Sequence, residues 1–247
     1  MAEDSHDPVT FQKLVSTFTD FLVVAIHTIL YERSIYPQTS FLSARRYNYP
    51  VRQNRHPKVC RWVTDAVAAV ETELLKGTVE RVAVVIYDKA DKPVERFMFD
   101  TSQFPVVPID EQTVPLERVD VNGETVHVLP VVDLEEQFRA TMSRLTNCGS
   151  TLQPIPPACT FTLAVELKDE SEPPVGHPQP WIPVQPRLQK TIRKNDGTTT
   201  SVRGEDMRGI KTTPLRSVSA GEMVFEMWIE EGKAKAEAAP SASDSTG

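Results

Sequence analysis

VERVAVVIYDKADKPVERFMFD, residues 79 to 100, decides the fold because the hydrophobic period of the chain changes there. Its first part, 79–88, is a nearly continuous apolar run of the kind that forms a buried central strand. The turn-rich DKADK at 88–92 separates that run from KPVERFMFD, so the stretch predicts a β-hairpin. Helical periods precede and follow this hairpin, and the sequence therefore predicts an α+β fold.

Two helices are predicted upstream of the hairpin. The first has Asp7 as its N-cap and Pro8 in its first turn, and Pro37 ends it. Its apolar residues recur at steps of three and four, at Phe11, Leu14, Phe18, Leu22, Ala25 and Ile29. A second apolar row widens this surface, so we expect the helix to be covered on more than one side. The second helix opens at Pro57 and closes at Gly77.

The end of the first helix, AIHTILYERSIYP at 25–37, carries polar groups that could form either a catalytic cluster or the polar edge of a buried helix. His27 has no second ligand at helical spacing, so a packed histidine with one hydrogen bond is favoured over a metal ligand or a base. Tyr31, Arg33 and Tyr36 come at the helix end, where aromatic rings pack and polar tips reach water. We interpret the cluster as structural.

Downstream of the hairpin the chain is rich in connections. A third helix is predicted from Asp133 to about Gly149, and CTFTLAVEL, 159–167, alternates as a strand does. The proline-rich DESEPPVGHPQP at 169–180 is typical of an extended linker. A hairpin that turns at 195–197 and a last strand, EMVFEMWIE, follow.

Composition limits the class of protein. The 247 residues include 27 basic and 34 acidic ones, a net charge of −7, which gives the whole chain no attraction to nucleic-acid phosphates. Three scattered cysteines without a CxxC pair suit a reducing compartment. The first residues lack a secretory signal, and the longest apolar run near the start, Phe21 to Ile26, is far short of a membrane span. A soluble cytosolic or nuclear protein is expected.

Catalytic and metal motifs are missing from the sequence. It contains no glycine-rich phosphate loop and no GxSxG elbow, and its five histidines show no metal-ligand spacing. One alternative is a cysteine nucleophile, Cys60, paired with His56 at a helix start, although most cysteines in that position are simply packed. We predict that the chain is not an enzyme and holds no metal or cofactor.

FLSARRYNYPVRQNRHP, Phe41 to Pro57, is predicted to be an irregular basic loop. Arginines at 45, 46, 52 and 55 alternate with aromatic residues there, a composition that can bind nucleic acid. A solvated loop or a protein-binding edge is favoured because of the net negative charge of the chain. Contact with DNA is therefore expected to be indirect.

Five strings occur in order along the chain: FLVVAIHTILYERSIYP, YNYPVRQNRHP, VAVVIYDKADKPVERFMFD, PPACTFTLAVEL and PWIPV. Together they resemble the HORMA-domain family, and within it the small accessory subunits of the translesion DNA polymerase zeta. The resemblance covers 11–231, with an apparent insertion at 106–131. It implies three helices packed on an antiparallel sheet and a mobile C-terminal segment, the safety belt, at about 168–231.

Two flanking segments lie outside the resemblance. Residues 1–10 are expected to be a short N-terminal extension. Residues 232–247 have too little apolar content to fold and are predicted to be a disordered tail.

The resemblance also implies a role. Such a protein is a non-catalytic adaptor in the nucleus, with the cytoplasm as a second location, and it acts in DNA damage tolerance. Its safety belt closes over a proline-containing peptide of the polymerase zeta catalytic subunit, which adds a strand to the sheet edge. A second surface binds a Y-family scaffold polymerase, and HORMA domains pair with one another or with a second copy. The alternative is a HORMA adaptor in spindle-checkpoint, cell-cycle or chromosome-axis signalling.

Individual residues follow from this resemblance. Trp62 and Trp181 match aromatic positions of the peptide groove, although both could instead be core residues. Thr212, Glu226 and Trp228 fall on the surface for the scaffold polymerase, where the animal pattern has leucine, glutamine and tyrosine. That contact is therefore expected to be rebuilt, weakened or absent.

Arg139 matches a dimer-contact arginine of the family. Its acidic neighbours Glu135 and Glu136 make a helix-surface ion pair the alternative.

Overall fold

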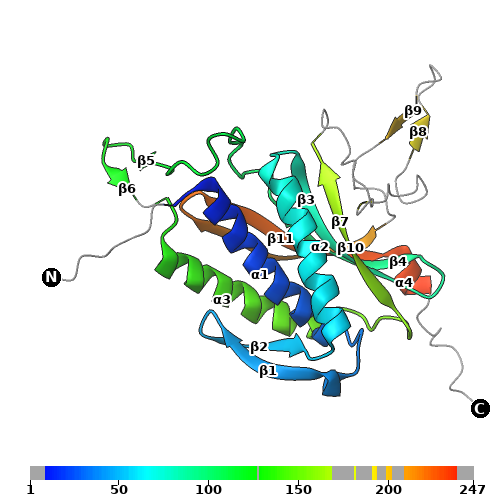
Figure 1. Ribbon diagram of the computed structural model, residues 1–247. Helices are drawn as coiled ribbons and strands as arrows, with labels where there is room; N and C mark the ends of the chain where they lie inside the picture. Colours follow the sequence, from blue (N-terminus) through cyan, green and yellow to red (C-terminus); the bar gives the residue numbers. More distant parts are fainter. Residues whose placement is uncertain are drawn as a thin grey trace, which may run out of the picture.

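Three long helices lie on one face of a five-stranded antiparallel sheet in the computed structural model of this chain (Figure 1). The structure describes residues 9–126, 128–168, 181, 191–193, 199–201 and 209–237. The strand order in the sheet is β10-β11-β4-β3-β7. The α+β class and the three-helix arrangement predicted from the sequence are confirmed.

The helices and strands have the following bounds. The helices are α1 (Phe11–Glu32), α2 (Pro57–Leu75), α3 (Val131–Asn147) and α4 (Lys233–Glu237), with short 3-10 turns η1 (Gln38–Ser40) and η2 (Cys148–Ser150). The sheet strands are β3 (Val79–Tyr87), β4 (Pro93–Asp100), β7 (Thr160–Leu167), β10 (Gly209–Ala220) and β11 (Met223–Gly232). Three separate hairpins are β1 (Phe41–Arg46) with β2 (Tyr49–Asn54), β5 (Arg118–Val119) with β6 (Thr125–Val126), and β8 (Thr191–Arg193) with β9 (Thr199–Ser201).

Two helix starts differ from the prediction. The N-cap of α1 is Thr10, whose side chain accepts a hydrogen bond from the backbone N–H of Lys13 at 3.2 Å. The proposed cap at residues 7 and 8 lies outside the described residues. Helix α3 begins at Val131 after Pro130, without a side-chain cap, two residues before the predicted start. The end of α2 is as predicted, because Gly77 follows it with φ +70°.

The predicted basic loop at 41–57 is wrong, because the segment forms the hairpin β1–β2. Its two turn residues, Tyr47 and Asn48, both have φ +52°. Such turns usually contain glycine, so the hairpin gives no strong turn signal in the sequence. Val51 and Phe41 are buried against the helices, which fixes the hairpin to the core.

The C-terminal part also differs from the prediction. Strand β10 was not predicted, and it pairs with β11 across a tight turn at Gly221, where φ is +63°. Helix α4 occupies Lys233–Glu237, so the predicted disordered tail is wrong for these residues. Residues 238–247 lie outside the described part of the chain. The hairpin β8–β9 agrees with the predicted one, whose turn at 195–197 is likewise outside the description.

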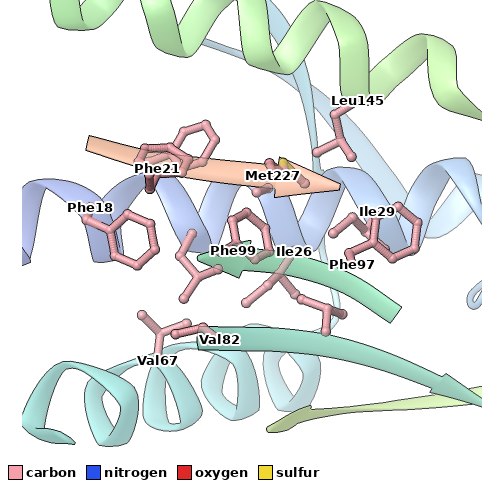
Figure 2. Packing of buried hydrophobic residues seen from close by; sticks show 14 of the residues in the cluster. Phe18, Phe21, Ile26, Ile29, Val67, Val82, Phe97, Phe99, Leu145 and Met227 are labelled. Carbon is pink, nitrogen blue, oxygen red and sulfur yellow. The ribbon is translucent and has the colours of Figure 1, made fainter. Parts of the chain in front are cut away.

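The core lies between α1 and the sheet. Figure 2 shows Phe18, Phe21, Phe99 and Met227 converging from α1, β4 and β11. The rings of Phe21 and Phe138 are stacked at 4.4 Å between centroids. Full burial of each large apolar side chain stabilises the fold by about 1.5 to 3 kcal/mol.

Helix α1 is the centre of this core. By length and composition alone it could cross a bilayer, but 67% of its most apolar window is buried inside the protein. Its apolar surface is therefore used by its own fold. His27 is buried as predicted, but its Nδ1 has no hydrogen-bond partner, so the predicted hydrogen bond is not formed at that atom.

The segment 106–131 is anchored to the helices. The Gln112 side chain is buried and donates to the backbone carbonyl of Leu75 at 2.6 Å, at the end of α2. Its backbone carbonyl accepts from the N–H of Gln12 at 3.2 Å, and Thr10 forms a bridge with Pro115. The segment therefore covers two helix ends.

A buried cluster of four charges ties the C-terminus to the core. Arg33 caps α1 and donates through Nε and Nη2 to the two carboxylate oxygens of Glu95, at 2.8 and 2.7 Å. Lys235 of α4 donates to Glu95 and to Glu231. The four side chains are 5% exposed or less, and their formal charges sum to zero. We call them the buried quartet.

Candidate functional site

An open cavity of about 640 Å³ lies where the end of α1, the start of α2 and the first residues of β7 meet. Its described lining comes from 36–40, 54–62 and 160–162, segments far apart in the sequence. The volume is typical of sites that bind ligands.

Aromatic rings form the wall of the cavity. The ring of Trp62 meets Phe161 edge to face at 4.8 Å, and Tyr36 meets the same ring at 6.4 Å and 86°. Burial raises the pKa of the Tyr36 hydroxyl. Trp62 is 41% exposed, so it is a wall residue and not a core residue. Aromatic faces of this kind can stack on proline rings at low entropic cost.

A buried asparagine organises the base of the cavity. The Asn54 amide donates to the Ser40 hydroxyl at 3.0 Å and accepts from the backbone N–H of His56 at 2.8 Å. His56 Nδ1 accepts from the N–H of Lys58 at 3.3 Å and caps α2. The Cys60 thiol donates to the Asn54 carbonyl at 2.9 Å. The structure does not join the His56 imidazole to the Cys60 thiol, so the cysteine–histidine alternative has no geometry to support it.

Strand β7 runs along this cavity at one edge of the sheet. Its inner side pairs with β3 from Val79 to Tyr87, and no described strand pairs with its outer side. The hairpin β10–β11 adds to the opposite edge, through β11 and β4. Backbone donors and acceptors on the outer side of β7 can therefore accept another strand.

Trp181 is half-buried and packs on the same main core cluster that Phe161 contacts. The flanking residues 169–180 and 182–190 lie outside the described residues. The structure therefore brings Trp62 to the cavity wall, and it places Trp181 against the core without placing it in the cavity lining. Phe161 and Tyr36, which the sequence analysis did not name as site residues, complete the wall.

Residues 14–202 match the family model for the HORMA domain, which is more than half of the chain. The chain belongs to the HORMA-domain family. It is 36% identical over 220 residues to the DNA polymerase zeta processivity subunit of Schizosaccharomyces pombe, covering 89% of this chain and 93% of that one. It is 28% identical over 237 residues to the mitotic spindle assembly checkpoint protein MAD2B of Danio rerio, covering 94% and 97%.

The fold of this HORMA protein is also similar to known structures. A chain of the crystal structure of the mitotic checkpoint complex matches 88% of this chain and 98% of its own length, with a TM-score of 0.62 and 17% identity. At that identity the likeness concerns the fold alone. The protein is a non-catalytic HORMA protein, as the resemblance implied.

The predicted second surface lies at the other edge of the HORMA sheet. Glu226, Trp228 and Glu230 alternate along β11 and therefore lie on one face of the sheet, the face turned away from the long helices. Thr212 of β10 is directly opposite Glu230, so it lies on the same face. Thr212 and Glu226 are exposed, and Trp228 is half-buried. The structure thus brings the three residues to one face.

Charged side chains surround Trp228 on that face. Its indole N–H donates to Glu230 at 2.9 Å, and the Arg81 guanidinium lies 5.8 Å from its ring centroid. Arg81 also contacts Asp100 at 3.0 Å and Glu166 at 3.1 Å. Burial raises the pKa of the Asp100 carboxyl, but hydrogen bonds from Ser102 and Arg81 together outweigh burial and hold this pKa below its usual range. A partner on this face would meet a fixed tryptophan among paired charges.

Arg139 lies on the outer face of α3. Its side chain is 41% exposed and contacts the Glu136 carboxylate at 3.3 Å, one turn earlier on the same helix. This is the ion pair that the acidic neighbours favoured, and it leaves the arginine accessible.

Proposed function

We propose that this HORMA protein is an accessory subunit of the translesion DNA polymerase zeta and captures a proline-containing peptide of the catalytic subunit. The peptide adds to the outer side of β7 and rests its apolar side chains in the aromatic cavity. The C-terminal segment, 168–231, acts as the safety belt that closes over it. The protein contributes binding and no bond chemistry, acts in the nucleus, and meets DNA only through its partners.

One observation carries this proposal: the outer side of β7, which pairs with no strand of the described chain, borders a cavity walled by Trp62, Phe161 and Tyr36. Strand addition supplies affinity for any extended peptide, and the aromatic wall selects its side chains. Because β10–β11 occupies the far edge of the sheet, none of the strands that the structure describes covers this edge. Relatives similar over most of the chain carry the name of the polymerase zeta processivity subunit, which supports the choice of partner.

A peptide panel tests this function. Labelled proline-containing segments of the polymerase zeta catalytic subunit are titrated with the chain and followed by fluorescence anisotropy. We expect Trp62→Ala and Trp181→Ala to weaken capture by about 2 kcal/mol or more, roughly thirtyfold. Trp228→Ala is the matched control, because this tryptophan lies on β11, which β4 and β3 separate from β7, and it should capture the peptide normally.

Two results would contradict the proposal. One is that no segment of the catalytic subunit binds. The other is that the two variants lose melting temperature in proportion to capture, as core tryptophans would.

We further propose that the face bearing Thr212, Glu226 and Trp228 contacts a Y-family scaffold polymerase. A fixed, half-buried aromatic side chain is a common anchor of an interface. Trp228→Ala should then abolish binding of the scaffold polymerase and leave peptide capture intact. If the variant bound the scaffold polymerase as tightly as the wild type, this proposed contact would be wrong.

Arg139 is accessible for pairing with another HORMA protein or a second copy. The variant Arg139→Glu tests this pairing through its effect on the molecular mass of the protein in solution.

The alternative function is an adaptor in checkpoint or chromosome-axis signalling, since several relatives are named as mitotic spindle assembly checkpoint proteins. The same panel separates the two, because checkpoint-ligand peptides would then bind in place of the polymerase segments.

A further inference from the structure

Three exposed cations lie in or beside the chain segment that lines the cavity, and one of them, Lys58, is itself a lining residue. Arg55 precedes α2, and Lys58 and Arg61 lie in its first turns. Lys58 is three residues before Arg61 and four before Trp62, so the two cations and the wall tryptophan share one side of the helix. We call Arg55, Lys58 and Arg61 the basic rim.

No carboxylate neutralises this rim among the described residues. The sequence from 33 to 64 contains no aspartate or glutamate, and the cavity segment 160–162 contains none either. Arg55 donates to a neutral partner, the backbone carbonyl of Thr39, at 2.9 Å. The nearest carboxylate along α2, Asp65, forms no ion pair with Arg61 in the described part of the chain. The rim is therefore a local positive site in a chain whose net charge is −7.

The positive charge adjoins the apolar part of the cavity. Lys58 itself lines the cavity and is its only lysine, arginine, aspartate or glutamate among the described lining residues. Helix α2 begins here, and the positive end of its dipole adds to the potential of the rim. A ligand that matches this site has an apolar segment for Trp62 and negative charge beside it.

Resting on the function proposed above, we infer that the captured peptide carries an anionic side chain next to its apolar segment, bound by the basic rim. The anion is a carboxylate or a phosphorylated hydroxyl, because both form charge-assisted hydrogen bonds with lysine and arginine. A peptide is favoured over nucleic acid because the cavity that contains Lys58 borders β7, the edge strand of the described sheet, and the chain as a whole repels phosphate backbones.

A displayed library of random 12-residue peptides tests the inference with the full chain. The pool that depends on Trp62 is identified by repeating the selection with Trp62→Ala. One selected sequence is then synthesised with aspartate, asparagine, phosphoserine or lysine at the position flanking its apolar segment. Binding of the four peptides is measured for the wild type, for Lys58→Glu and for Lys13→Glu.

We expect the selected pool to be enriched in acidic residues at one offset from the apolar segment. Lys58→Glu should weaken the aspartate peptide about fivefold at low salt, as expected for one exposed ion pair, and should strengthen the lysine peptide. The asparagine peptide should change less than about twofold. Phosphoserine binding tighter than aspartate would identify a phosphorylated ligand.

Lys13→Glu is the control, because this exposed lysine lies in the first turn of α1, whereas the cavity follows its last turn. It should leave all four affinities unchanged.

The possible failures are distinguishable. A pool that needs Trp62 but shows no acidic enrichment, or an aspartate peptide indifferent to Lys58→Glu, overturns this inference and leaves peptide capture standing. The absence of any Trp62-dependent pool removes the proposed function and the inference with it. A single-stranded oligonucleotide that binds the wild type and not Lys58→Glu, with no acidic enrichment among peptides, would assign the rim to nucleic acid instead.

Discussion

Replacing Lys235 by methionine should destabilise the whole fold, although the sequence places this residue in an unstructured tail. Methionine fills a similar volume but carries no charge. The buried quartet then holds Arg33 against Glu95 and Glu231, and its net charge changes from zero to −1. The Glu231 carboxylate loses most from this change. Its Oε1 already has no hydrogen-bond partner, and the nearby Lys211 ammonium is 3.9 Å from that oxygen, too far to form a hydrogen bond.

The expected loss follows from the burial of the cluster. Lys235 is 3% exposed, and the two carboxylates it contacts are 0% and 5% exposed. Removing one member of a buried, hydrogen-bonded charge cluster costs about 3 to 5 kcal/mol, because an uncompensated charge stays in a poorly solvated site. That is a large part of the 5 to 15 kcal/mol of a typical domain.

Urea unfolding followed by tryptophan fluorescence measures this loss. Lys233→Met is the matched control, since Lys233 lies on the same helix, its side chain is half-exposed, and its ammonium contacts the exposed Glu237 carboxylate at 3.8 Å. It should cost less than about 0.5 kcal/mol. The double variant Lys235→Met, Glu231→Gln restores neutrality and should recover part of the loss. Equal stability of the two lysine variants, or a double variant that is merely additive, would refute the role of the quartet.

Three further predictions concern a buried histidine, a glycine in a tight turn and a ring of the core. Burial lowers the pKa of His27, so below about pH 6.5 the unfolded chain binds a proton there while the folded chain does not. The free energy of unfolding should therefore fall as acid is added, by at most about 1.4 kcal/mol per pH unit. Urea titrations at two pH values measure this slope, and His27→Leu should reduce it. Gly221→Ala places a methyl group 2.0 Å from the carbonyl of Val128 at φ +63°, so it should cost more than about 2 kcal/mol and yield little folded protein. Gly123→Ala has φ +84° but no atom within 4 Å, so it should cost only the backbone strain of about 1 to 2 kcal/mol and still fold. Phe138→Ala removes the ring stacked on Phe21 and should lower Tm by about 10 °C in calorimetry.

Local patterns were sufficient to predict several parts of this fold. The strands of the hairpin β3–β4 are mostly buried, so burial selects their side chains directly, and the alternation of β7 and the glycine that follows α2 are equally local signals. Strand β10 lies at the edge of the sheet and tolerates Pro214 beside a register shift, so it lacks such a pattern. Helix α4 is stabilised by the contact of Lys235 with Glu95, 140 residues away, which no local composition reveals.

The candidate site was predicted only in part, and through the resemblance. Trp62 could be named because it matched a family position, but its wall partners could not. Tyr36 comes from the segment between α1 and η1 and Phe161 from β7, and only the fold brings them together. One local signal did bear on the cysteine–histidine alternative. His56 directly precedes Pro57, and a residue before a helix-opening proline is in the N-cap position. There the His56 Nδ1 accepts from the backbone N–H of Lys58 and is not paired with the Cys60 thiol.

The outer margin of β7, on which no described strand lies, has a practical consequence for handling the protein. Without a bound peptide, it offers eight residues of main chain as a template on which another copy can align. Concentrated samples lacking ligand should therefore self-associate slowly, and fusing a captured segment to the chain should keep them monodisperse. The rate of self-association during storage would therefore indicate whether a peptide occupies the margin of β7.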